Sequence, residues 1–249
     1  MINDAVLAET VSIIGSGGDT VEAYLARPLA PGPLGGVVVI HHMPGYDAAS
    51  KEITRRFAVM GYDAICPNLH YREAPGTAPD DAAAAVRAAG GVPDDRLVGD
   101  VDGAARHLRG LANANGRVGV IGYCSGGRQA FLAACSLPLQ AAVDCYGAFV
   151  VAKPPSEFPL RVSPITHLAA NLSCPLLGLF GANDKNPSPD EVAELDRILT
   201  DAGKEHEFHV FDNAGHGFFA VDRAMYVQEA ATRGWELITA FYAKHLSTR

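Results

Sequence analysis

The segment VGVIGYCSGGRQAFLAACS, residues 118–136, decides the fold of this chain. Its first five residues are a continuous apolar run, which predicts a strand buried on both faces. Residues 125–136 follow with the pattern of a helix. Only a sharp turn fits between the strand and the helix, and Cys124 occupies that turn. The segment therefore predicts the strand–turn–helix unit from which α/β folds with parallel sheets are built.

The turn itself, GYCSGG at residues 122–127, has the G-x-nucleophile-x-G form of a nucleophile elbow, with cysteine in place of the usual serine. Glycines on either side of Cys124 avoid clashes with the neighbouring strand and helix. The N-terminus of a helix also favours a thiolate and binds a developing oxyanion. Two alternatives stay open here: a glycine-rich turn around an ordinary buried cysteine, and a dinucleotide site, which the absence of G-x-G-x-x-G disfavours.

Strands and helices are predicted to alternate through the rest of the chain. VSII and VEAYLAR, joined by a glycine-rich turn, predict an N-terminal antiparallel hairpin. Later apolar runs predict buried strands at 37–40, 63–66, 141–147, 175–181 and 207–212. We therefore expect a mostly parallel central sheet with helices on both faces, in a single α/β domain over residues 1–249. Residues 68–93 lack a strong periodic face and are expected to form a surface excursion.

The composition narrows the class of protein. With 48% hydrophobic residues among 249, the chain can bury a large core. A formal charge of -8 disfavours nucleic-acid binding. The start, MINDAVLAETVSII, does not have the pattern of a secretory signal, and no apolar stretch has the length of a membrane span, so we expect a cytoplasmic protein. The spacing of the five cysteines and nine histidines predicts neither a disulfide framework nor a metal site, and no cofactor is expected.

Two further residues stand where partners of Cys124 are needed. Asp184 follows an apolar strand in the loop ANDKNPSP, and His216 follows the next strand in the loop NAGHGFF. This chain order of nucleophile, acid and histidine is the order of a nucleophile-elbow fold. The imidazole would take the thiol proton, and the carboxylate would orient the imidazole. Asp190 and Asp212 are alternative acids, but the first lies in a helix start and the second at a strand end.

These residues, together with GYDAICPNL, YREAPGTA and VGDVDGAARHLR, resemble the dienelactone hydrolase family in content and order. The resemblance implies an α/β-hydrolase fold, with Cys124 as nucleophile, His216 as base and Asp184 as the orienting acid. It further implies oxyanion donors at the backbone N–H groups of Ser125 and Met43. The expected partner is a small ester or lactone, cleaved through a thioester acyl-enzyme.

The chain departs from the family pattern at two positions. His42 stands where typical members carry a glutamate next to the nucleophile, and Ala220 stands where members that act on dienelactone carry an arginine. We expect His42 to face the pocket, because ligands of open α/β sheets bind beyond the carboxyl ends of the strands; the alternative is a histidine satisfied within its loop. Tyr123 and Arg72 are further candidates for substrate contact.

A thiolate leaves a tetrahedral adduct more readily than an ordinary alkoxide does. Enol lactones, aryl esters and thioesters are therefore the expected substrates. Two other functions remain open at this point: a catalytically silent binding protein on the same fold, and acyl transfer to a nucleophile other than water. The sequence makes no prediction of the oligomeric state.

Overall fold

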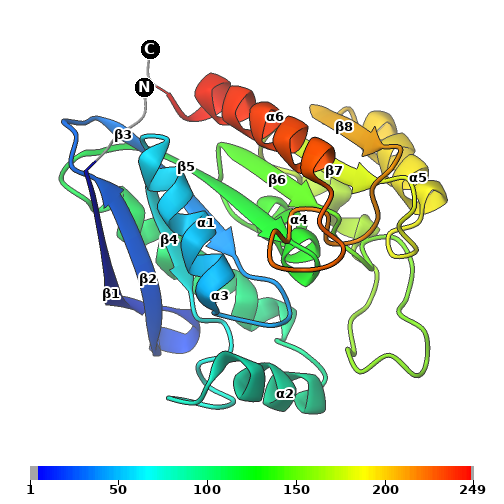
Figure 1. Cartoon of the computed structure of the whole chain (residues 1–249), viewed down its shortest axis with the longest axis horizontal. Coiled ribbons are helices and arrows are strands. Elements are labelled where there is room, and N and C mark those ends of the chain that lie inside the picture. The colour runs from blue at the N-terminus through cyan, green and yellow to red at the C-terminus, as the bar shows by residue number, and fades with distance from the viewer. Residues whose placement is uncertain (1–4, 248–249) are drawn as a thin grey trace.

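The computed structural model describes residues 5–247. Residues 1–4 and 248–249 of the predicted domain lie outside the described residues, and residues 1–4 are also part of the segment searched for a secretory signal. One eight-stranded sheet with the order β1-β2-β4-β3-β5-β6-β7-β8 runs through the molecule (Figure 1). Its strands are β1 Val6–Ile14, β2 Thr20–Pro28, β3 Leu34–Ile40, β4 Asp63–Pro67, β5 Ala114–Tyr123, β6 Ala141–Cys145, β7 Leu176–Gly181 and β8 His206–Phe211.

The sheet is parallel from β4 to β8, while β1 pairs antiparallel with β2 and β2 antiparallel with β4. The predicted mostly parallel sheet with an N-terminal antiparallel hairpin is therefore confirmed. Because β3 lies between β4 and β5, the strand order reverses at β3, and an open α/β sheet binds its ligands at the carboxyl edge of such a point.

Helices cover both faces of the sheet (Figure 1). On one face lie α1 and α6, and on the other lie α3, α4 and α5. Their bounds, with the remaining helix α2 and two short 3-10 turns, are α1 Ala48–Val59, α2 Pro79–Ala89, α3 Asp94–Arg109, α4 Ser125–Ser136, α5 Pro189–Asp201, α6 Gln228–Leu246, η1 Ser16–Gly18 and η2 Thr166–Asn171.

Alternation along the strands divides the core into two clusters. Val38 and Ile40 of β3 pack with α3 and α4, while Val37 and Val39 pack with α1 and α6. The central strands are thus buried on both faces, as the continuous apolar runs predict. Because one sheet joins elements from both ends of the chain, the single domain stays our prediction.

The segment 68–93 is the one expected to form a surface excursion, and that description stays our prediction. It contains α2, which begins with Pro79 at its first turn and ends at Gly90 in the left-handed conformation, φ 94°. Ala82, Ala83 and Val86 of this helix are buried, and Val86 belongs to the core cluster on the α3 side. Alanine side chains are small enough to let the helix pack closely with little apolar periodicity, which explains why the sequence pattern is weak here.

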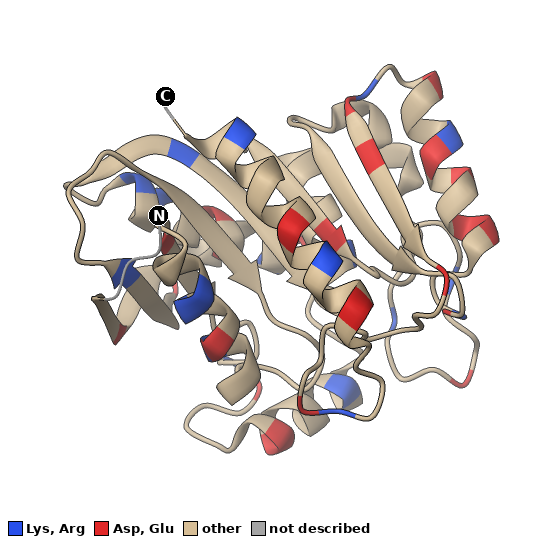
Figure 2. Cartoon of the chain, turned by 45° about the horizontal axis from the view of Figure 1, so that its top comes forward, with Lys and Arg blue, Asp and Glu red and all other residues tan. Residues whose placement is uncertain are grey.

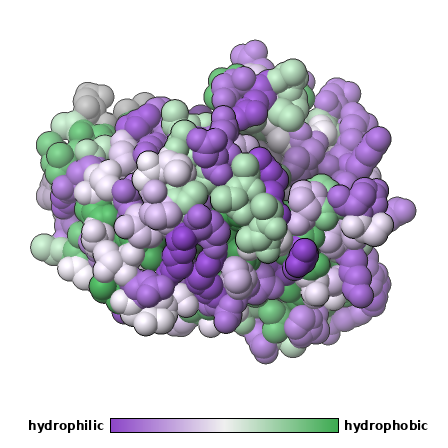
Figure 3. All heavy atoms as spheres, turned by 90° about the horizontal axis from the view of Figure 1, so that it is seen from below, coloured by the Kyte–Doolittle hydropathy of each residue, from purple (hydrophilic) through white to green (hydrophobic). Residues whose placement is uncertain are grey.

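Residues with positive and negative charge are interspersed along the helices (Figure 2). On α5, for example, Arg197 pairs with Glu194 and Asp201. The face shown in Figure 3 mixes hydrophilic and hydrophobic residues without one continuous apolar patch. None of the helices in residues 5–247 is long and apolar enough to cross a membrane.

Candidate active site

Cys124 lies in a strained turn between the end of β5 and the start of α4. Its backbone has φ 58° and ψ -121°, a conformation that costs free energy for any residue with a Cβ. Its N–H donates to the carbonyl oxygen of Cys145 at 3.1 Å. A Cβ on Gly122 would lie 1.8 Å from the Gly126 oxygen, and one on Gly126 would lie 2.6 Å from the Ile40 oxygen. The two glycines are thus required for the turn to pass between its neighbours.

Asp184 and His216 come from the loops that follow β7 and β8. The carboxylate of Asp184 is buried, and its Oδ2 lies 2.9 Å from Nδ1 of His216. Its Oδ1 accepts the backbone N–H of Asn186 at 2.9 Å. The ring of Tyr146 packs edge-on against the imidazole, with 5.1 Å between centroids. The imidazole is therefore fixed on two sides, with its Nε2 left for another partner.

His216 is electrostatically unlike an exposed histidine. Burial alone would lower its pKa, but the hydrogen bonds with Asp184 and with the thiol of Cys124 outweigh burial and raise the pKa of His216 to about 10. At neutral pH the ring is therefore a positively charged imidazolium in the cavity that Cys124 also lines.

The residues predicted to take part in the reaction line one cavity of about 410 Å³. Cys124, Ser125, Asp184, His216 and Met43 all line it. Its remaining walls are largely apolar and include Val92, Phe149, Phe158, Leu160 and Val162. The structure thus brings the predicted triad and both predicted oxyanion positions to one cavity at the carboxyl ends of the strands. The rival acids Asp190 and Asp212 are exposed and do not line the cavity.

A family model described as "Dienelactone hydrolase family" matches residues 21–246. The chain belongs to the dienelactone hydrolase family. The resemblance seen in the sequence and the prediction of a lactone hydrolase of this family are confirmed.

Relatives match this family member over nearly its whole length. A protein of Escherichia coli K12 named "Putative carboxymethylenebutenolidase" is 33% identical over 98% of this chain and 89% of the relative. A protein of Bradyrhizobium sp is named "Probable 2-oxo-3-(5-oxofuran-2-ylidene)propanoate lactonase". It is 32% identical, and the match covers 94% of this chain and 93% of the relative. The crystal structure titled "Putative Dienelactone Hydrolase" from Klebsiella pneumoniae has a TM-score of 0.85 at 31% identity, covering 97% of this chain and all of that one.

Two histidines of this dienelactone hydrolase family member, His41 and His70, also line the cavity, although neither was proposed for the site from the sequence. His41 donates from Nδ1 to the His42 carbonyl at 2.9 Å and accepts the Leu69 N–H at Nε2, 3.2 Å away. His70 packs edge-on against His41, with 4.6 Å between ring centroids. Burial lowers the pKa of His41 to about 4 and that of His70 to about 3, so both rings are neutral at physiological pH. Both histidines come shortly after a strand, His41 after β3 and His70 after β4, and this position in the sequence could have placed them at the cavity.

Three predicted substrate contacts lie elsewhere. His42 points to Asp47, with Nε2 2.7 Å from Oδ2, and lines a separate groove between α1 and α6. Tyr123, the last residue of β5, lines the same groove, because its side chain points to the face of the sheet that α1 and α6 cover. Arg72 donates to the fully buried carboxylate of Asp100 at 2.8 and 2.9 Å, and to Asp19 at 2.8 Å. The structure brings none of the three to the cavity of Cys124.

Replacing Asp184 by Asn should move the titration of His216 to lower pH, because the carboxylate is one of the two partners that raise its pKa. NMR of the His216 ring measures the titration, and we expect its midpoint near pH 10 in the native protein. The folded-state pKa exceeds the unfolded value of about 6.5, so the stabilisation is complete below about pH 6.5 and is lost as the pH rises through about 10. Asp190→Asn is the matched control and should leave the midpoint unchanged; a native midpoint near 6.5 would contradict the ion pair.

Replacing Arg72 by Ala should lower the free energy of unfolding by about 3 kcal/mol, because it leaves the Asp100 carboxylate buried and unpaired. The KM for an aryl ester should stay within about twofold, because Arg72 does not line the cavity. Urea denaturation and steady-state kinetics measure the two quantities. Arg106→Ala, which breaks an exposed pair with Asp102, should cost less than about 1 kcal/mol. A raised KM at unchanged stability would return Arg72 to the list of substrate contacts.

Proposed function

We propose that this chain hydrolyses lactones or activated carboxylic esters through a Cys124–His216–Asp184 triad and a thioester acyl-enzyme. The observation that carries the proposal is the shared cavity: Cys124 stands on a strained elbow beside His216, whose Nδ1 is held by a buried carboxylate. These are the three roles of a nucleophile, its proton partner and the group that orients it.

In the first half of the reaction, the Cys124 thiolate attacks the carbonyl carbon and forms a C–S bond. The carbonyl oxygen gains the negative charge and accepts hydrogen bonds from the backbone N–H groups of Ser125 and Met43. Ser125 begins α4, so its N–H is one of the first four of the helix, which have no acceptor within it. The His216 imidazolium then gives its proton to the departing oxygen as the C–O bond breaks.

In the second half, the thioester is hydrolysed. Neutral His216 removes a proton from water, the hydroxide attacks the thioester carbonyl, and the C–S bond breaks to release the acid and the thiolate. Asp184 keeps Nδ1–H of the ring pointed at itself, so that Nε2 is the nitrogen that accepts and donates in both halves.

The nucleophile restricts the substrate. A tetrahedral adduct that holds a thiolate and an alkyl alkoxide expels the thiolate and returns the ester, so productive substrates carry a better leaving group. Enol lactones and aryl esters meet this requirement. Similarity to the Bradyrhizobium protein, whose name is that of a lactonase, supports a lactone.

A carboxylate on the substrate would need a cation in the cavity. Ala220 supplies none, and Arg72 is committed to Asp100 and Asp19. Arg87 and Lys185 line the cavity and are our candidates for this contact.

Cys124→Ala should lower kcat/KM for an enol lactone and an aryl ester by about 10³-fold or more, because no nucleophile remains. Cys124→Ser should lose most of the activity, since a hydroxyl needs a stronger base than a thiol. Acid-quenched native enzyme should carry an acyl group on Cys124 by peptide mass spectrometry.

Cys174→Ala, at a half-buried thiol outside the cavity, is the matched control and should keep native turnover. Undiminished turnover in Cys124→Ala, or an acyl group on another side chain, would overturn the nucleophile assignment.

A further inference from the structure

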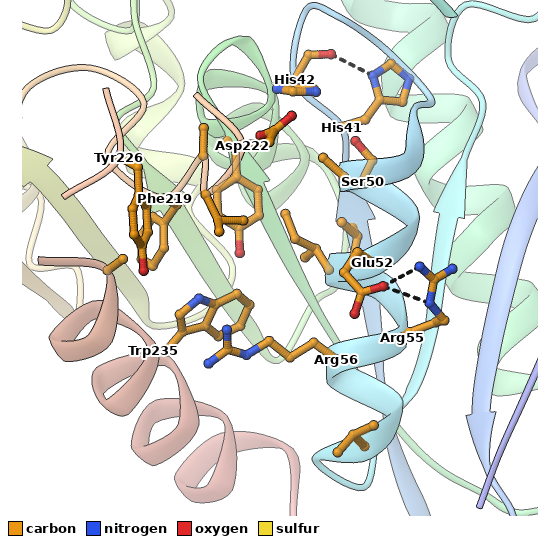
Figure 4. A pocket seen from close by; sticks show the side chains of 18 of the residues that line it. His41, His42, Ser50, Glu52, Arg55, Arg56, Phe219, Asp222, Tyr226 and Trp235 are labelled. Carbon is orange, nitrogen blue, oxygen red and sulfur yellow. Dashed lines mark hydrogen bonds and ion pairs between the residues drawn. The ribbon is translucent and has the colours of Figure 1, made fainter. Parts of the chain in front are cut away.

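A second and larger hollow of about 1440 Å³ lies between α1 and α6. We name it the α1/α6 groove, and Figure 4 shows it from close by. Its aromatic walls include Phe219, Tyr226 and Trp235. Among the residues that line it and the catalytic cavity, only His41 is common to both. The groove is therefore a separate compartment, and none of Cys124, Asp184 and His216 lines it.

One cation in the α1/α6 groove lacks an acidic partner. The guanidinium of Arg56 lies over the ring of Trp235, with 3.8 Å from its central carbon to the ring centroid (Figure 4). The carboxylates along the groove already have arginines of their own: Glu52 pairs with Arg55, Glu236 with Arg233, and Asp222 with Arg223. Within residues 5–247 no carboxylate pairs with Arg56. The Arg56 side chain is exposed and lines the groove, so its guanidinium is open to a ligand and has no counter-ion of its own among residues 5–247.

A buried hydroxyl beside this cation also lacks a partner. The side chain of Tyr123 is 4% exposed and lines the groove, and its Oη forms no hydrogen bond within the part of the chain that the structure describes. Tyr123 and Tyr226 are both close enough to Arg56 to interact with it electrostatically. A buried hydroxyl without a partner costs free energy, which an acceptor supplied by a ligand would recover.

We propose that the α1/α6 groove binds a small planar carboxylate, an aromatic or conjugated acid, with its carboxylate on Arg56 and on the Tyr123 hydroxyl. A guanidinium that stacks face-on over an indole keeps its N–H edge free, and that edge matches a carboxylate in two parallel hydrogen bonds. The apolar body of the acid then packs on the Trp235 and Phe219 side of the groove. Binding here does not depend on the proposed chemistry at Cys124.

Trp235 is the only tryptophan of the chain, so its fluorescence reports directly on the groove. We expect benzoate to change this fluorescence with saturation, whereas benzamide, which lacks the charge, and acetate, which lacks the ring, bind at least about tenfold more weakly. Arg56→Gln should raise the Kd for benzoate about tenfold or more, and Tyr123→Phe about threefold. Arg55→Gln is the matched control: it removes the neighbouring arginine, which is already paired with Glu52, and should change Kd less than about twofold.

The titration is repeated on enzyme alkylated at Cys124 with iodoacetamide, which blocks the thiol and places a carbamidomethyl group in the catalytic cavity. Unchanged benzoate binding supports a separate site. The proposal is overturned if alkylation abolishes the signal, if Arg56→Gln and Arg55→Gln act alike, or if benzoate has no effect. It is also overturned if the fluorescence depends on protein concentration without ligand, because a second copy of the chain would then occupy the groove.

Discussion

The fold is organised around a contact between backbones at the turn that carries Cys124. Gly122 and Gly126 approach each other so closely that neither has space for a Cβ, and Gly126 also lies against the Ile40 carbonyl at the end of β3. This contact lets α4 begin directly behind β5 and keeps Cys124 at a positive φ. The strained backbone at Cys124 costs free energy, and the packing of the surrounding sheet and helix stabilises the fold by more than this cost. The remaining site residues reach Cys124 because parallel strands all end at the same edge.

That geometry explains why so much could be predicted from the sequence. The apolar runs give the strands, and their order fixes which loops meet, so Cys124, Asp184 and His216 could be placed together from chain order alone. Met43 and Ser125 were named only because the family resemblance implies them. For the triad the prediction depends on which strand each residue follows, and all five positions line one cavity.

Chain position does not fix the direction of a side chain. Tyr123 and Cys124 are adjacent, yet they line different hollows: Tyr123 is the last residue of β5 and points to the α1/α6 side of the sheet, whereas Cys124 stands on the turn beyond the strand. Arg72 lies in the expected loop, but a buried carboxylate at Asp100, distant in sequence, holds it away from the cavity. His41 and His70 were missed as parts of the wall, because their role depends on burial. Burial arises from the packing of the segment before α2, which has no periodic pattern of its own.

His41 joins two loops through one ring. The Nδ1–H of the ring donates to the carbonyl of His42, in the loop after β3 that leads to Met43. Its Nε2 accepts the N–H of Leu69, in the loop after β4 that leads toward α2. A neutral imidazole has one donor and one acceptor, and both are used. The ring takes up a proton only near pH 4, whereas His216 gives one up near pH 10. Between these limits neither ring changes its charge, so the wall that His41 forms and the imidazolium of His216 present the same electrostatics to the cavity over a broad interval of pH.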